Sequence, residues 1–178
     1  MSKLSFAATT IFCFVVAGCI PANAQKESKK FSVGFGFEAG LPLGDAKDAY
    51  HFTAGSNIRF SYHAGPGFVT LTTGATVWLP KSDAGDDTKA SLAIPIKAGY
   101  KYILHKPFFV MGELGYSSFK VYYKDGYGDL AKSTSGGFTY SPAVGVNFNA
   151  LEIAIKYEAT SLTGGTVSNV ALRLGVNF

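Results

Sequence analysis

The chain has 178 residues, a length that fits one domain, and it is 47% hydrophobic and 15% aromatic but only 16% charged, with 21 glycines. So little charge is poorly suited to a surface that faces water on every side. The formal net charge is +4 without a clustered basic stripe, which argues against nucleic acid as a partner.

The first segment, residues 1–24, has the pattern of a secretory signal peptide. Lys3 supplies the positive start, an uncharged apolar run extends from Phe6 to Ala17, and Ala22-Asn23-Ala24 forms a small-x-small cleavage site. The run is shorter than the roughly 20 residues of a membrane-spanning helix. We expect cleavage after Ala24, and lipidation at Cys19 is the alternative. Both cysteines lie in this segment, so the rest of the chain cannot form a disulfide.

A short basic lead, residues 25–30, precedes the predicted barrel domain, residues 31–178. In that domain apolar and polar side chains alternate with period two, and no window has the spacing of a long amphipathic helix. This alternation is typical of β-strands, whose successive side chains point to opposite faces. The predicted strands are about 31–41, 50–62, 67–79, 91–103, 108–119, 137–148, 151–161 and 167–178.

The connections between these strands differ in length. Those after the second, fourth and sixth strands are short, those after the first, third and fifth are longer, and the longest is the polar loop 120–136. Barrels of the outer membrane combine short periplasmic turns with longer external loops. An even number of strands also returns both termini to the periplasmic side. Pro95 lies inside the fourth strand and predicts a bulge there.

The last strand shows the alternation most clearly, because one of its faces is wholly apolar. That face consists of Val170, Leu172, Leu174, Val176 and Phe178. The opposite face is polar or small, and the chain then stops on an aromatic residue. A β-strand crosses a bilayer only in a closed barrel, where all backbone groups are bonded within the protein. The pattern therefore favours an all-β fold, an eight-stranded antiparallel up-and-down transmembrane β-barrel.

A soluble barrel or sandwich with an apolar core is the rival architecture, and the charged residues argue against it. An eight-stranded barrel has an interior just wide enough for side chains to fill it. The many bulky Phe, Tyr, Leu, Ile and Val side chains therefore fit better on its outside, in lipid. The charged side chains of the opposite face would then point inward, toward one another.

Nine charged residues share the polar face of the strands, and they are nearly balanced in sign. They are Glu38, Arg59, Lys97, Lys101, Glu113, Glu152, Lys156, Glu158 and Arg173. A buried charge is tolerated only when it is paired. We therefore predict an internal salt-bridge network that plugs the barrel. Glycines of the same face would make room for these long side chains.

Aromatic residues gather near the predicted strand ends, as expected for amphipathic rings at the two membrane interfaces. The periplasmic girdle would contain Phe60, Tyr62, Tyr100, Tyr102, Phe108, Phe148 and Phe178. The outer girdle would contain Tyr50, Phe52, Tyr116, Phe138 and Tyr140.

These residues resemble the small outer-membrane β-barrel family of Gram-negative bacteria, porin-like proteins that include eight-stranded OmpX/OmpA-type barrels. The resemblance rests on Gly40-Leu41-Pro42-Leu43-Gly44-Asp45, Lys97-Ala98-Gly99-Tyr100-Lys101-Tyr102, Gly112-Glu113-Leu114-Gly115-Tyr116 and the terminal Phe178. It implies location in the outer membrane, contact with its lipid, and recognition of Phe178 by the barrel assembly machinery. It carries over no catalytic residue and no cofactor.

Three functions are compatible with this architecture. The first is a structural or surface-exposed barrel whose loop 120–136 contacts an extracellular partner, and we expect this one. The second is a narrow porin-like channel. The third is a lipid-modifying enzyme, for which His51 near the outer end would be the candidate base, although we expect no enzyme. The histidines are isolated in sequence, and the acids of the loop near Asp83 are better explained by solvation than by calcium binding.

Overall fold

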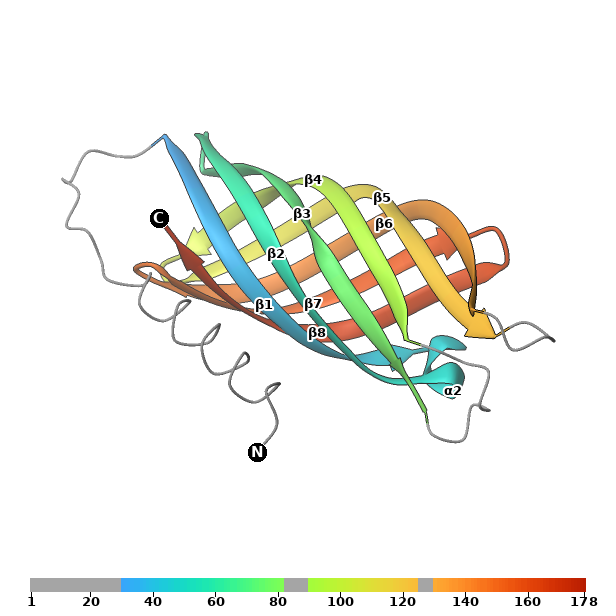
Figure 1. Cartoon of the computed structure of the whole chain (residues 1–178). Coiled ribbons are helices and arrows are strands. Elements are labelled where there is room, and N and C mark those ends of the chain that lie inside the picture. The colour runs from blue at the N-terminus through green and yellow to red at the C-terminus, as the bar shows by residue number, and fades with distance from the viewer. Residues whose placement is uncertain (1–29, 82–89, 125–129) are drawn as a thin grey trace, which may run out of the picture.

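The structure is a computed structural model, and it describes residues 30–81, 90–124 and 130–178. The predicted signal peptide and its cleavage site lie outside these residues. The strands are β1 (Phe31–Leu43), β2 (Tyr50–Ala64), β3 (Gly67–Pro80), β4 (Ser91–His105), β5 (Phe108–Lys124), β6 (Leu130–Phe148), β7 (Leu151–Leu162) and β8 (Gly165–Asn177). Each strand pairs with the next, and β8 pairs with β1, so the eight antiparallel strands form a closed up-and-down barrel (Figure 1). The predicted fold class is confirmed.

Closure depends on the first and last strands. The β1–β8 ladder runs from Gly34 opposite Asn177 to Leu43 opposite Ser168. Phe178 extends this ladder, because its backbone N–H donates to the carbonyl of Val33 at 2.9 Å. The C-terminal end of the chain therefore lies beside the start of β1, at one rim of the barrel (Figure 1). With no free edge, the backbone groups of the wall are bonded within the protein.

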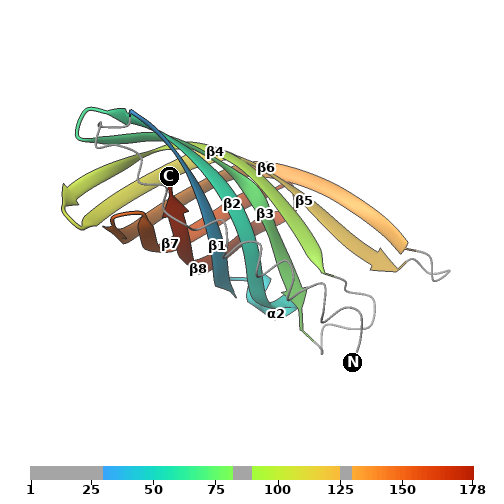
Figure 2. The ribbon, with the colours of Figure 1, turned by 60° about the vertical axis from the view of Figure 1, so that its left-hand side comes forward.

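The strands β5 and β6 are longer than predicted, and the expected loop 120–136 is mostly strand. Their ladder continues from Lys120 opposite Thr134 to Lys124 opposite Leu130. This hairpin extends past the neighbouring strands at the rim opposite the C-terminus (Figure 2). A strand that extends beyond the lipid does not need an apolar face. The alternation that predicts strands in this chain is therefore absent from the ends of β5 and β6. A short helix, α2 (Ala46–Ala49), lies at the same rim.

Pro95 does not produce the predicted bulge. The β3–β4 register is the same on both sides of it, but the ladder lacks pairs between Thr73 opposite Ile96 and Thr76 opposite Ala93. Proline has no N–H to donate, so the ladder is interrupted there rather than shifted. The hydroxyl of Thr73 donates instead to the carbonyl of Pro95 at 3.0 Å. The register shifts of the wall lie at strand ends, one of them between Tyr50 and Phe52.

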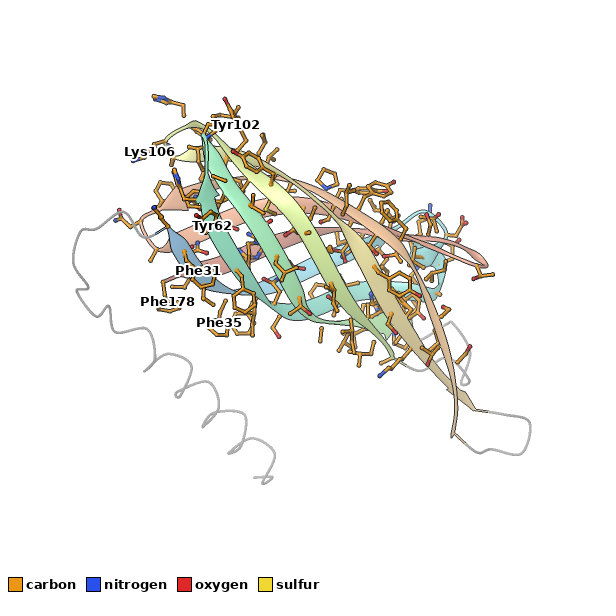
Figure 3. All side chains as sticks on the ribbon, turned by 90° about the horizontal axis from the view of Figure 1, so that it is seen from above. Phe31, Phe35, Tyr62, Tyr102, Lys106 and Phe178 are labelled. Carbon is orange, nitrogen blue, oxygen red and sulfur yellow. The ribbon has the colours of Figure 1, made fainter. Side chains whose placement is uncertain are left out.

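The outside of the wall is an apolar band, with side chains that extend away from the ribbon on all sides (Figure 3). Its exposed members include Phe35, Phe37, Leu71, Val77, Ile96, Leu114, Val144, Ile155, Leu172 and Leu174. Large exposed apolar surfaces mark contact with another apolar phase. A band that surrounds a closed barrel is satisfied by lipid acyl chains. In the described part of the chain, no helix is long and apolar enough to span a bilayer.

Aromatic rings gather on the outside at the rim that holds the C-terminus. Phe31, Phe35, Tyr62, Tyr102 and Phe178 lie at this end (Figure 3), and the ring centroids of Phe35 and Phe178 are 6.5 Å apart. Tyr62, Tyr102 and Phe178 belong to the predicted periplasmic girdle, whereas Phe31 and Phe35 were not part of that prediction.

Tyr50 does not belong to the outer girdle, contrary to prediction. Its hydroxyl bonds to Ser91 Oγ at 2.7 Å, and its ring lies 5.6 Å from that of Trp78, whose side chain is buried inside the barrel. The register shift between Tyr50 and Phe52 breaks the alternation that placed Tyr50 outside.

Candidate functional site

The candidate site is the barrel interior, which we call the lumen. The structure places all nine predicted charged residues there, and each lies within 4.0 Å of a group of opposite charge. They come from β1, β2, β4, β5, β7 and β8. Eight of the nine are buried, and the side chain of the ninth, Glu38, is only 9% exposed. Alternation along the strands brings them to the same interior.

Glu152 is the centre of the half of the network nearer the C-terminal rim. Its Oε1 accepts from Arg59 Nη1 at 2.6 Å and from Arg173 Nη1 at 2.5 Å. Its Oε2 accepts from Lys101 Nζ at 2.6 Å. One fully buried carboxylate therefore holds three cations, in charge-assisted hydrogen bonds of the strong kind.

Two lysines and two glutamates form the other half. Lys156 Nζ donates to Glu38 Oε2 at 2.5 Å and to Glu158 Oε2 at 3.1 Å. Lys97 also donates to Glu158. Lys97 Nζ lies 3.5 Å from Glu113 Oε2, so Glu113 of β5 also belongs to this half. Each of the nine charged side chains therefore lies beside an opposite charge and belongs to the network.

Two neutral residues that the sequence analysis did not select connect these halves. The Oδ1 of Asn57 accepts from Nε and Nη2 of Arg173 at 3.1 and 2.9 Å, while its Nδ2 donates to Glu38 at 2.8 Å. Thr72 accepts from Arg59 and donates to Glu113 at 2.5 Å. Asn57 and Thr72 lie at strand positions whose side chains point to the same face as the charged residues. This shared face was the signal in the sequence that could have identified them.

Gly36 gives Arg173 the room to reach its partners. A Cβ atom at Gly36 would lie 2.6 Å from the guanidinium carbon of Arg173. That side chain is held by hydrogen bonds to Asn57 and Glu152, so it cannot move aside without losing them.

We therefore expect Gly36→Ala to lower the free energy of unfolding by about 1–3 kcal/mol, the usual cost of overpacking. Gly112 is the matched control, because a Cβ there would meet nothing within 4 Å. Gly112→Ala should leave stability unchanged or raise it slightly. Urea unfolding, followed by fluorescence of Trp78, the only tryptophan, measures both. Equal effects of the two substitutions would contradict the packing described at Gly36.

Buried apolar side chains lie inside the lumen on both sides of the charged network. On the side of α2 the buried cluster is Ala46, Trp78, Ala93 and Phe119, and the rings of Trp78 and Phe119 are 5.4 Å apart. On the side of the C-terminal rim the buried cluster is Phe109, Met111, Ala143 and Ala154. Lys101 Nζ lies 4.6 Å from the centre of the Phe109 ring, a cation–π distance that joins this cluster to the network.

His51 and His63 contact groups outside the charged network. His51 Nδ1 lies 2.9 Å from the carbonyl oxygen of Pro80, in an exposed position. His63 packs against Phe68, with ring centres 5.2 Å apart. No hydrogen bond of the described residues links His51 to a serine and an acid. The same residues contain no group of three or more His, Cys, Asp or Glu that could hold a metal ion, and Asp83 lies outside them.

Comparisons with known proteins agree with this architecture. A model of the "Outer membrane protein beta-barrel domain" family matches residues 10–178. A search of curated proteins found no matching relative.

Several solved structures share the fold. Ail, the attachment invasion locus protein of Yersinia pestis, has a TM-score of 0.62 and 17% identity, over 83% of this chain and 97% of that one. The N-terminal β-barrel domain of Pseudomonas aeruginosa OprF has a TM-score of 0.62 and 11% identity, over the same two shares. Neisserial surface protein A has a TM-score of 0.58 and 13% identity, over 86% of this chain and 100% of that one. At these identities the likeness concerns the fold.

Proposed function

We propose, on the premise that this chain belongs to the outer membrane protein beta-barrel domain family, that it acts as a closed, non-conducting barrel. In this role the barrel anchors an external rim, and the rim contacts partners at the cell surface. The outer membrane is the location of the family, and the apolar band around the wall suits it.

The observation that carries this proposal is the filling of the lumen. Glu113 and Glu152 are buried to 1% and 0% exposure, between apolar clusters that include Trp78 and Phe109. An ion that crossed the barrel would have to separate charges that are both paired and buried, which is energetically costly. This is the interior of a plug rather than of a porin, whose lumen is a water-filled channel.

Recordings in planar bilayers test the proposal. The refolded barrel should give no steady conductance steps. Heat-modifiable gel mobility of the same sample shows that the protein is folded. A porin of known conductance, recorded in the same bilayers, is the control for insertion. Steady ion-selective steps that change in Glu113→Ala would refute the plug and favour the narrow channel.

We further propose that the external rim makes contact with an extracellular partner through residues 120–136. Support comes from the β5–β6 hairpin, which extends beyond the other strands (Figure 2). The name of Ail describes attachment and invasion, and we extend only the idea of surface contact to this chain. We expect no catalysis, in keeping with the isolated position of His51.

We also propose how the chain is exported and assembled. We expect the signal peptide to be removed after Ala24, with lipidation at Cys19 as the alternative. We expect the assembly machinery to recognise Phe178, whose side chain is 48% exposed at the rim. Contact with outer-membrane lipid follows from the same apolar band.

A further inference from the structure

A hollow lies at the C-terminal rim, between the β4–β5 turn and the β6–β7 turn. We call it the rim pocket, and its volume is about 330 Å³. It is lined by Phe68, Ile103, Lys106, Pro107, Asn147 and Asn149. The alternation along their strands places the side chains of Phe68, Ile103 and Asn147 on the lumen face. The pocket therefore lies at the mouth of the lumen and not on the lipid-facing wall.

The side-chain amide of Asn147 has an unused acceptor in this pocket. Its Oδ1 is buried and has no hydrogen-bond partner among the described residues. The backbone N–H of Asn147 donates to the carbonyl of Pro107 at 2.8 Å, which fixes the residue beside the β4–β5 turn. The side-chain amide turns readily about its last bond, so Oδ1 can be presented to the pocket. A buried acceptor without a donor is costly, and a ligand with an N–H group would remove that cost.

The surroundings of the rim pocket are positively charged. Lys106 lies at the rim itself (Figure 3). The charged network has five basic and four acidic side chains, so one positive charge is left over. The surplus lies toward this end, because the single carboxylate of Glu152 pairs with three of the cations. One of these is Lys101, whose Nζ lies 5.8 Å from the centre of the Phe68 ring. An anionic group in the pocket is therefore attracted.

The end of a polypeptide chain combines the groups that these features require. Its carboxylate suits Lys106, and the amide N–H of its last residue suits Asn147 Oδ1. An apolar last side chain would pack against Phe68. A carboxylate alone would leave Asn147 without a donor, and the ammonium group of a free amino acid would be repelled by the positive surplus. The chain's own last residue, Phe178, is bonded to Val33 of β1 and does not line the pocket.

We propose that the rim pocket binds the C-terminal residue of a partner protein in the periplasm, with the carboxylate at Lys106 and the last amide N–H at Asn147. The turns at this rim are short, as are the periplasmic turns of outer-membrane barrels. The site goes beyond the proposed function, because it lies at the rim opposite the β5–β6 hairpin and does not depend on whether the lumen conducts.

Fluorescence anisotropy of a labelled tetrapeptide tests the site on the full barrel, refolded into lipid nanodiscs that leave both rims accessible. The peptide carries its label at the N-terminus and ends in leucine with a free carboxylate. We expect saturation at one peptide per barrel. The same peptide with an amidated C-terminus should bind about tenfold more weakly, the loss expected for one charge-assisted hydrogen bond. A peptide that is N-methylated at its last amide should bind about fivefold more weakly, because it cannot donate to Asn147.

Substitutions in the barrel place these losses in the pocket. Lys106→Ala should weaken the free-acid peptide about tenfold and the amidated peptide little. Asn147→Ala should weaken the free-acid peptide about fivefold, and N-methylation should then cost nothing further. Lys30→Ala is the control, because Lys30 is an exposed cation near the β2–β3 turn of the same rim and does not line the pocket. It should leave binding unchanged.

The modified peptides test the proposal on the unsubstituted barrel, so it stays falsifiable if a variant does not fold, which heat-modifiable mobility shows. Absence of saturable binding, or equal binding of the free-acid and amidated peptides, would overturn the site. So would a loss in Lys30→Ala as large as that in Lys106→Ala. Displacement of the peptide by an equal concentration of acetate would reduce the site to a carboxylate pocket and overturn the role of Asn147.

Discussion

Glu152→Gln should be the most destabilising single change in the lumen, lowering the free energy of unfolding by about 3–5 kcal/mol. The carboxylate holds Arg59, Arg173 and Lys101 at 2.5–2.6 Å and has no exposure to water. Glutamine has nearly the same size but no charge. Three cations would then lie close together without the anion that offsets their repulsion, so the cost comes from charge and not from packing.

Urea unfolding in lipid vesicles measures this loss, with Trp78 as the reporter. Asp48→Asn makes the same chemical change at an exposed position of α2 and should shift stability by less than about 0.5 kcal/mol. If Glu152→Gln cost no more than Asp48→Asn, the buried network would not stabilise the barrel as described.

An arginine in the middle of the apolar band should have the second-largest effect. Leu114 is 57% exposed on the outside of β5, opposite Ala98 of β4. Leu114→Arg should cost about 2–4 kcal/mol in a bilayer, the range found when a lipid-facing position near the midplane receives this charge. In a soluble barrel the same exposed position would accept arginine at almost no cost.

Leu104→Arg is the matched control, because Leu104 has a similar exposed fraction, 58%, but is the penultimate residue of β4, next to the β4–β5 turn. There the guanidinium reaches the headgroups, and we expect a cost of about 0–1 kcal/mol. The difference between the two variants, from urea unfolding in vesicles, reports depth in the membrane. Equal costs for the two variants, or a larger cost for Leu104→Arg, would contradict the location of the apolar band in the bilayer interior.

The face of each strand could be predicted from sequence because alternation is a local property. Val170, Leu172 and Leu174 had to lie on one side once β8 was extended, and their bulk excluded the narrow interior. The nine charged residues followed from the same parity. The alternation does not show which opposite charge each of these residues contacts. That Glu152 receives three cations depends on side chains from four strands, far apart in the chain.

Two of the errors have a common cause, which is that the pattern of alternating side chains weakens outside the lipid. Lys120 to Lys124 pair as strand although their side chains do not alternate between apolar and polar, because no membrane there requires an apolar face. Tyr50 turns inward after a register shift that leaves no mark in the sequence. Pro95 was expected to shift the register, but a missing N–H can also leave a gap in the ladder, and only the pairing distinguishes these results.

Spin labelling at Leu172 tests the orientation of the wall most directly. The chain beyond residue 24 has no cysteine, so a single Leu172→Cys accepts one nitroxide. In vesicles, the label should collide more often with oxygen, which is soluble in lipid, than with a water-soluble nickel chelate. A label at Asp48, exposed in α2, should show the reverse. Greater access of the nickel chelate at Leu172 would contradict an apolar band that faces acyl chains.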